Sequence, residues 1–172
     1  RKESSAASDV YKRQVPWAQI STLLGRPPIL SYASYCLDNW HKINPEDGVT
    51  LDNVALNYNF LGGIDEDWFV TIHVCIEHAA KPAIEAAFKI ADAYEQKSCS
   101  DAVLQTNLET IKEAMLNVNH IFRKMPEKCD PYIYYHRVRP YIFGWKNNPS
   151  LPEGLIYENC FCLLYTSPSP RD

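Results

Sequence analysis

An arginine beside several aromatic residues is the feature of this sequence best suited to chemistry. It lies in the stretch 132–149, YIYYHRVRPYIFGWKNNP. At about 100° per residue, a helix here would carry one shared face, made by Tyr134, Val138, Tyr141 and Trp145, with Tyr135 and Ile142 beside it. Arg139 lies at the rim of that face, one turn after Tyr135. This arrangement would suit a small aromatic acid, because the rings cover its apolar part and the guanidinium binds its carboxylate through two hydrogen bonds.

A second interpretation of the same stretch needs no ligand. The aromatic residues would then belong to the hydrophobic core, and Arg139 would pair with a nearby carboxylate. Pro140 and Gly144 limit how far a helix can continue in either case. The pattern leaves both interpretations open.

Three further residues could do chemistry, and these are His73, Glu77 and His78 in HVCIEH. The two histidines are five residues apart, which places them about 140° apart around a helix, so one metal ion cannot bind both. His73 falls on the apolar face of the expected helix and His78 on the polar face. Glu77 follows His73 by four residues and can pair with it. His73 is therefore either a core histidine with a satisfied hydrogen bond or a polar group that faces a cavity.

Apolar periodicity predicts that helices position these residues. We expect helices over 15–24, 29–41, 66–96 and 100–122. The third is the longest, and Pro82 should bend it. Before it, a turn is expected over 44–48, and 54–60 should form a short strand or an extended loop that ends at Gly62 and Gly63. The chain is thus predicted to be mostly helical, in the all-α class.

The two ends of the sequence resemble translations of one sequencing-library adapter in opposite orientations. They are SSAASDVYKRQ, residues 4–14, and CLLYTSPSPRD, residues 162–172. We therefore expect residues 1–14 and 162–172 to be non-native and residues 15–161 to hold the native domain. The alternative is that both are ordinary tails.

Composition excludes several classes of partner. The formal charge is −4, and it becomes about −6 without the two ends, so no basic patch is expected to neutralise the phosphates of a nucleic acid. No apolar run reaches about 18 residues, which argues against a membrane span. The five cysteines between the two ends are widely spaced, and this favours reduced thiols in a cytoplasmic protein over disulfides or a zinc site. We expect a monomer.

The stretch 134–149 also resembles the indoleamine 2,3-dioxygenase family of haem enzymes, through RVRPYI, GWK and the following NP. Four other segments support the resemblance in the same order along the chain. They are VPW at 15–17, PPIL with Tyr32 at 27–32, WF at 68–69 leading to His73 and Glu77, and GLIYE at 154–158. The resemblance covers essentially all of residues 15–161.

The resemblance implies a helical bundle that is part of the large haem-binding domain of this fold. The full-length protein would hold haem b and use O₂ to open the indole ring of L-tryptophan, or of a related indole. The product would be N-formylkynurenine, in the kynurenine pathway of tryptophan catabolism. Such an enzyme is a dioxygenase whose cofactor supplies the redox chemistry.

The same resemblance assigns roles to individual residues. Arg139 matches the arginine that binds the substrate carboxylate. His73, the expected catalytic residue, matches a distal position that is serine in some members and histidine in related tryptophan dioxygenases, where it can hydrogen-bond the indole N–H. The residues that match walls of the substrate pocket are Tyr134, Tyr135, Tyr32, Phe69 and Val70.

The sequence also departs from the family pattern. Typical members carry phenylalanine where Tyr134 stands, and often a second aromatic residue where Val70 stands. The iron-ligating proximal histidine and the glycine-rich loop of the family lie beyond the point where the adapter-like tail begins, and His41, His120 and His136 do not match the proximal position. We therefore expect that this chain by itself does not bind haem in the five-coordinate mode of the family and is inactive.

Two other functions stay open. One is an O₂-binding, myoglobin-like haem protein of the same fold, and the other is a helical interaction module without a cofactor. Arg139 favours the enzyme over the oxygen carrier, because an oxygen store has no carboxylate to hold. The interaction module is motivated by the absence of the proximal segment.

Overall fold

The computed structural model describes residues 16–26, 30–142, 155–157 and 160–162. The chain divides into two compact units: Ala33–Arg139, and residues 1–32 together with 140–172. With the exception of Tyr32, all the residues assigned above to a candidate site belong to the unit Ala33–Arg139.

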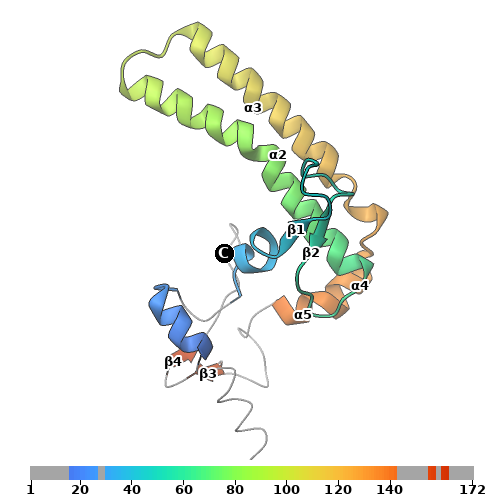
Figure 1. The fold of residues 1–172 in the computed structure, drawn as a ribbon. Helices are drawn as coiled ribbons and strands as arrows, with labels where there is room; N and C mark the ends of the chain where they lie inside the picture. The colour runs from blue at the N-terminus through green and yellow to red at the C-terminus, as the bar shows by residue number, and fades with distance from the viewer. Residues whose placement is uncertain (1–15, 27–29, 143–154, 158–159, 163–172) are drawn as a thin grey trace, which may run out of the picture. The chain divides into compact units, whose positions relative to one another are not determined.

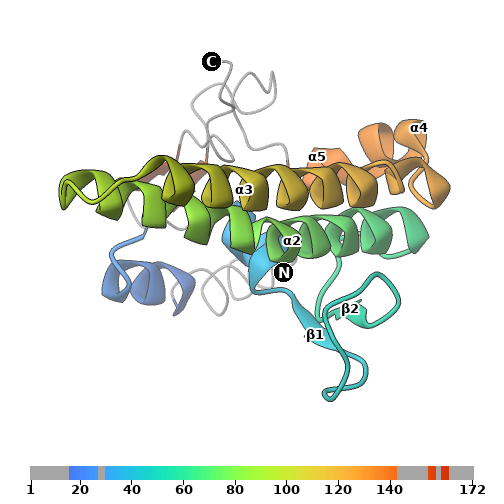
Figure 2. The same ribbon diagram turned by 90° about the horizontal axis from the view of Figure 1, so that it is seen from above.

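Two long helices form most of that unit. α2 spans Ile64–Glu95 and α3 spans Asp101–Phe122, and they lie side by side as a hairpin in both ribbon views (Figure 1, Figure 2). α3 begins where the Ser100 side chain accepts a hydrogen bond from the Val103 amide at 3.3 Å, as an N-cap does. Both helices confirm the ranges expected from periodicity. α2 continues through Pro82.

One buried carboxylate fixes the start of α2. Glu66 is 0% exposed, and it accepts the backbone N–H groups of Phe60, Leu61 and Gly62, each at 2.9 Å. Gly62 and Gly63 have φ angles of 77° and 104°, a region that glycine adopts at little cost. The predicted break at these two glycines is confirmed, and the loop before the helix is bonded to the first turn of that helix.

The helix expected over 29–41 is wrong beyond Leu37. A π-helical segment, η1, covers Ala33–Leu37, and strand β1 covers Trp40–Lys42. β1 pairs antiparallel with strand β2, Val54–Leu56. Of the two alternatives for 54–60, the structure therefore has a strand at its beginning, and the expected turn over 44–48 joins the pair, with a hydrogen bond from the Asp47 amide to the Asn44 carbonyl at 3.2 Å.

Asn39 explains why the helix stops. Its side-chain N–H groups donate to the carbonyls of Tyr35, at 3.1 Å, and Tyr58, at 2.8 Å, and its side-chain oxygen accepts from the Tyr58 amide at 2.9 Å. The side chain is buried, so every one of these bonds replaces a bond to water. This contact joins positions nineteen residues apart, which local periodicity does not reveal.

The chain after α3 returns to the start of α2. It forms the segments η2, Met125–Glu127; α4, Pro131–Ile133; η3, a π-helix over Tyr134–Val138; and α5, Arg139–Ile142. The core where η2 and η3 meet α2 contains Trp68, Ile72 and Cys129. The Trp68 indole N–H donates to the Lys124 carbonyl at 2.9 Å, and this bond joins the two ends of the hairpin.

The other unit contains little regular structure among its described residues. A helix covers 16–23, within the expected range 15–24. Strands β3, Leu155–Tyr157, and β4, Cys160–Cys162, form an antiparallel pair. The strands among the described residues are three residues long each, so the all-α class is confirmed. In the part of the chain that the structure describes, no helix combines the length and apolarity needed to cross a membrane.

Candidate functional site

Three of the predicted site residues form one aromatic cluster. The rings of Phe69 and Tyr134 stack, with centroids 4.1 Å apart and planes 23° apart. The Phe69 ring also contacts the His73 ring, and the centroids of these two rings are 4.1 Å apart. Phe69 and His73 are one turn apart on α2, and Tyr134 comes from η3. The structure thus brings together residues from two segments that the sequence assigned to one pocket wall.

His73 is held in one tautomer by the helix that carries it. Its Nδ1 lies 2.7 Å from the Phe69 carbonyl oxygen, which can only accept, so Nδ1 carries the hydrogen and Nε2 is the acceptor of the neutral ring. Burial lowers the pKa of His73, and this effect exceeds the opposing effects of the Phe69 carbonyl and the Glu77 carboxylate. The ring is therefore neutral at neutral pH. His78 is exposed, as expected for the polar face.

A capped turn positions Tyr134 against α2. The Asp130 carboxylate accepts the amides of Tyr132, at 2.8 Å, and Ile133, at 3.0 Å, and so caps α4. The Asp130 amide in turn donates to the Asp65 carboxylate at 2.7 Å. Because Asp65 lies in the first turn of α2, the segment that carries Tyr134 is anchored to the helix that carries Phe69 and His73.

The π-helical segment changes where Arg139 points. The Arg139 amide donates to the Tyr134 carbonyl, an i to i+5 bond, so one turn separates these two residues. In a regular α-helix, five residues would place them about 140° apart. The Arg139 guanidinium lies over the Tyr135 ring, 5.1 Å from its centroid. This contact confirms the prediction that Arg139 and Tyr135 are neighbours.

The shared aromatic face expected over this stretch is only partly formed. Tyr134 is half-buried and Val138 is 1% exposed, but Tyr141 is 57% exposed. The expectation assumed 100° per residue throughout, and the π-helical turn breaks that spacing. Tyr135 and Arg139 are exposed as well, so they form a surface pair next to the half-buried cluster of Phe69, His73 and Tyr134. Trp145 lies outside the described residues.

Two predicted wall residues are not part of the cluster described here. Val70 is 0% exposed and one position along α2 from Phe69, which makes it a packing residue in the interior. Tyr32 is half-buried and belongs to the other unit, residues 1–32 with 140–172. The interpretation of the aromatic residues as core is also partly confirmed, because Phe69 and Tyr134 pack against the core around Trp68.

Tyr35 is a residue that sequence reasoning missed. It lies in η1, is 6% exposed, and its ring lies 5.8 Å from the Phe60 ring. Its hydroxyl approaches the Tyr134 hydroxyl without the geometry of a good hydrogen bond, and neither hydroxyl has a partner among the described residues. Burial raises the pKa of both tyrosines, so both hydroxyls stay protonated. No periodicity signal marks Tyr35, because the segment around it is neither a regular helix nor a strand.

The described residues offer no ready-made metal centre. Within 16–26, 30–142 and the two short strands β3 and β4, no group of three or more histidine, cysteine or acidic side chains could hold a metal ion. Four cysteines of this part are free thiols, namely Cys36, Cys75, Cys99 and Cys129.

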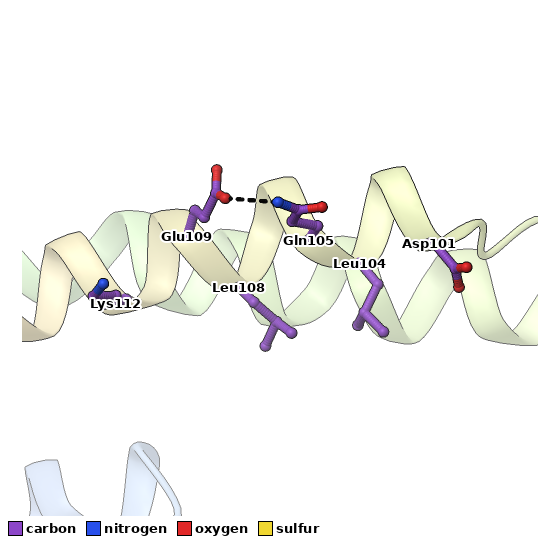
Figure 3. Close-up of a pocket in the computed structure, with 6 residues that line it drawn as sticks. All are labelled: Asp101, Leu104, Gln105, Leu108, Glu109 and Lys112. Carbon is purple, nitrogen blue, oxygen red and sulfur yellow. Dashed lines mark hydrogen bonds between the residues drawn. The ribbon is translucent and has the colours of Figure 1, made fainter.

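A separate hollow lies on the surface of α3 (Figure 3). It is lined by Asp101, Leu104, Gln105, Leu108, Glu109 and Lys112. The Gln105 side chain donates to Glu109 at 3.1 Å, and the two leucines point to one side of the helix (Figure 3). All six residues belong to one helix and none belongs to the aromatic cluster, so this hollow is not the predicted site.

Comparison with known proteins agrees with the resemblance seen in the sequence. The family model described as indoleamine 2,3-dioxygenase matches residues 11–169. This range extends beyond 15–161, and the native boundaries expected at those positions stay a prediction.

Individual relatives come from mammals and fungi. The chain is 38% identical over 144 residues to indoleamine 2,3-dioxygenase 1 of Rattus norvegicus, covering 84% of this chain and 35% of the rat protein. It is 31% identical over 144 residues to indoleamine 2,3-dioxygenase 2 of Homo sapiens, with the same coverage of 84% and 35%. It is 28% identical over 150 residues to indoleamine 2,3-dioxygenase of Saccharomyces cerevisiae, covering 83% and 33%.

The chain thus spans about a third of the length of these relatives. The family match covers far more than half of the chain itself. The chain therefore belongs to the indoleamine 2,3-dioxygenase family.

Proposed function

We propose that this chain is part of a haem-dependent dioxygenase that opens the indole ring of L-tryptophan with O₂ to give N-formylkynurenine. Membership in the family supports the reaction class. The observation that carries the assignment to these residues is the cluster of Phe69, Tyr134 and His73, in which two stacked rings and a neutral imidazole meet. Free thiols at the described cysteines support a reducing, cytoplasmic setting.

The proposed roles divide between apolar contact and polar orientation. The stacked rings of Phe69 and Tyr134 form one apolar wall against which an indole packs, and this wall keeps water away from it. His73, with its hydrogen on Nδ1, has Nε2 as an acceptor for the indole N–H. Arg139 binds the substrate carboxylate, and its contact with Tyr135 limits the directions that the guanidinium can take.

These residues fit the substrate side of a haem site but do not include its iron ligand. The aromatic cluster suits the substrate side of a flat, apolar cofactor, whereas His41, His120 and His136 do not match the position of the family's iron-ligating histidine. When bound, haem supplies the iron chemistry that activates O₂. Residues 15–161 alone are therefore proposed to be inactive. A purified 15–161 fragment should show no stoichiometric Soret band. A strong Soret band together with tryptophan turnover would overturn this part of the proposal.

Replacement of Arg139 tests the substrate assignment. In the full-length enzyme, Arg139→Leu should lower kcat/KM for L-tryptophan about 10- to 100-fold, because a charge-assisted hydrogen-bond pair is worth about 1.5–3 kcal/mol. Turnover of tryptamine, which has no carboxylate, should change little. Arg137→Leu is the matched control, since Arg137 is an exposed arginine two positions away.

Two results would contradict this assignment. One is an equal loss of kcat/KM for L-tryptophan and for tryptamine, which would mean that Arg139 acts on folding rather than on the carboxylate. The other is an O₂-binding protein whose haem spectrum does not respond to tryptophan. That second result would favour the oxygen carrier over the enzyme.

A further inference from the structure

One hydrogen bond joins the first turn of α2 to the segment that carries Tyr134 and Arg139. In this bond the half-buried Asp65 carboxylate accepts the Asp130 amide at 2.7 Å, across 65 positions of the sequence. An ionised acceptor makes such a bond stronger than one between two neutral groups. All four residues belong to the compact unit Ala33–Arg139. The bond therefore ties the end of this unit to its longest helix.

Two backbone hydrogen bonds continue from Asp130 to Arg139. The Tyr134 amide donates to the Asp130 carbonyl at 2.9 Å. The Arg139 amide donates in turn to the Tyr134 carbonyl. Pro131 begins α4 between them, and its ring fixes the φ angle at that position. Each bond starts at the residue where the preceding one ends, so a continuous connection leads from the Asp65 carboxylate to the backbone of Arg139.

The ring contact between Tyr134 and α2 does not replace this connection. The Phe69 and Tyr134 rings stack with centroids 4.1 Å apart, but aromatic pairs accept a range of offsets and tilts. A hydrogen bond is more directional, because it weakens steeply as the angle at the hydrogen falls toward about 120°. The Asp65 bond therefore limits how far the segment can rotate against α2. Such a rotation would move the exposed Arg139 side chain.

We propose that Asp65 is a positioning residue for the substrate carboxylate. It acts through Arg139, to which the three bonds connect it, and does not contact the substrate. A guanidinium binds a carboxylate through two parallel N–H···O bonds, and both require the correct placement of its plane. A displaced Arg139 therefore weakens the binding of an amino acid more than that of the corresponding amine. This inference rests on the proposed function, since it takes Arg139 as the carboxylate-binding residue.

Equilibrium binding tests the proposal without depending on turnover. L-Tryptophan and tryptamine are titrated into the full-length holoprotein by isothermal titration calorimetry, and the ratio of their Kd values measures the preference for a carboxylate. Asp65→Ala and Asp65→Leu both remove the acceptor, and each should reduce this preference about tenfold, the effect of losing one charge-assisted hydrogen bond. Asp65→Asn keeps an acceptor oxygen and should retain most of the preference. Two replacements of different volume protect the test if one of them fails to fold.

Asp67→Ala is the matched control. Asp67 is half-buried in the same turn of α2, and its carboxylate accepts the Asn59 side chain in the loop before the helix. Its replacement removes the same charge from the start of the helix dipole but leaves the Asp130 bond in place, so the preference should be kept. Arg139→Leu gives a second comparison. Asp65→Ala added to Arg139→Leu should reduce the preference no further, because both changes act on one contact.

The outcomes separate this inference from the proposed function. A preference that Arg139→Leu removes and the two acceptor-free Asp65 variants keep overturns the inference and leaves the role of Arg139 intact. Equal weakening of both compounds by these Asp65 variants overturns it too, because Asp65 then only supports the fold.

Three further results are decisive. Equal losses in Asp65→Asn and Asp65→Ala would assign the effect to charge and overturn the connection through the Asp130 amide. A preference controlled by Asp65 and Arg139 in a protein that does not open the indole ring keeps the inference and overturns the proposed reaction. A wild-type protein without any preference for L-tryptophan overturns the inference and the role of Arg139 together.

Discussion

His73 combines a fixed tautomer with a lowered pKa. Its Nδ1 bond to Phe69 is made within α2, so the ring orientation does not depend on a ligand. The sequence predicted that this histidine lies on the buried face, but the pattern could not choose between a satisfied core histidine and a group facing a cavity. The structure confirms the satisfied hydrogen bond, which Nδ1 makes within the helix, and the cavity-facing interpretation stays a prediction.

Protonation of His73 should destabilise the fold in mildly acidic solution. Because burial places the folded-state pKa below the usual 6.5, the unfolded chain binds more protons than the folded one between these two values. Stability is therefore complete above about pH 6.5 and falls as the pH drops from there toward the folded-state pKa. The unfolding midpoint, measured at pH 7.5 and 5.5, should drop more in the wild type than in His73→Gln.

The matched control for this test is His78→Gln. His78 is exposed on the same helix, so its replacement should leave the pH dependence as in the wild type. Identical pH dependence in the wild type and in His73→Gln would show that His73 keeps an ordinary pKa.

Much of the candidate site could be predicted from residue types and order. Phe69, His73 and Tyr134 were assigned through the resemblance to a family, and the structure brings their rings together. Tyr35 could not be found in this way. It lies in the short π-helical segment η1, and no local apolar pattern marks its burial.

Glu66 holds the loop before α2 through three backbone N–H groups. Glu66→Gln keeps the shape of the side chain but turns one acceptor into a donor, which would face an N–H group. We expect a loss of about 1–3 kcal/mol in the free energy of unfolding, as for other buried groups that lose a partner. Urea denaturation of the full-length protein measures the change.

Glu85→Gln serves as the comparison. Glu85 is 56% exposed and lies 3.7 Å from Lys81, an ion pair on the surface of α2. Such pairs contribute little, so its replacement should change the stability by less than about 0.5 kcal/mol. Equal losses from the two substitutions would mean that the Glu66 bonds do not stabilise the loop.

The two N-caps offer a second matched pair. Asp130 caps the segment that carries Tyr134, and Ser100 caps α3, whose N-terminal end carries none of the residues assigned to the site. Asp130→Ala and Ser100→Ala should each cost about 1 kcal/mol of stability. Only Asp130→Ala should also weaken tryptophan binding in the full-length enzyme, because it frees the turn that positions Tyr134. Equal affinities in the two variants would show that the α2 core alone holds Tyr134 in place.

The long helices were the most predictable elements, and the π-helical ones the least. α2 and α3 carry apolar residues at regular helical intervals over many turns, and this signal survives local irregularities. The stretch around η1 carries the same kind of signal over too few turns, and the bonds made by Asn39 outweigh it. Apolar periodicity does not reveal the π-helical turn over Tyr134–Val138, which departs from the spacing of 100° per residue on which the shared aromatic face was predicted.

The α2–α3 hairpin exposes many apolar side chains. The large hydrophobic residues on it that are more than half exposed are Ile64, Ile84, Phe88, Tyr94, Met115, Leu116 and Phe122. Exposed apolar surface promotes association. The isolated 172-residue chain should therefore be loosely packed or prone to aggregate.

Dye binding measures this property. The isolated chain should enhance the fluorescence of ANS at neutral pH, and the double substitution Phe88→Lys with Leu116→Lys should reduce the signal. Tyr58→Lys is the control, because Tyr58 is 78% exposed and lies outside the hairpin. Sharp, well-dispersed amide NMR signals from a monomer would contradict the expectation.

The bond between the Asp130 amide and the Asp65 carboxylate joins positions 65 residues apart, beyond the end of α3 and at the start of α2. While it is formed, the amide hydrogen of Asp130 is shielded from exchange with solvent deuterium. The exchange rate of this single hydrogen therefore reports how often the open ends of the hairpin separate. Because Tyr134 follows four residues later, the same rate tells how often the aromatic cluster itself comes apart.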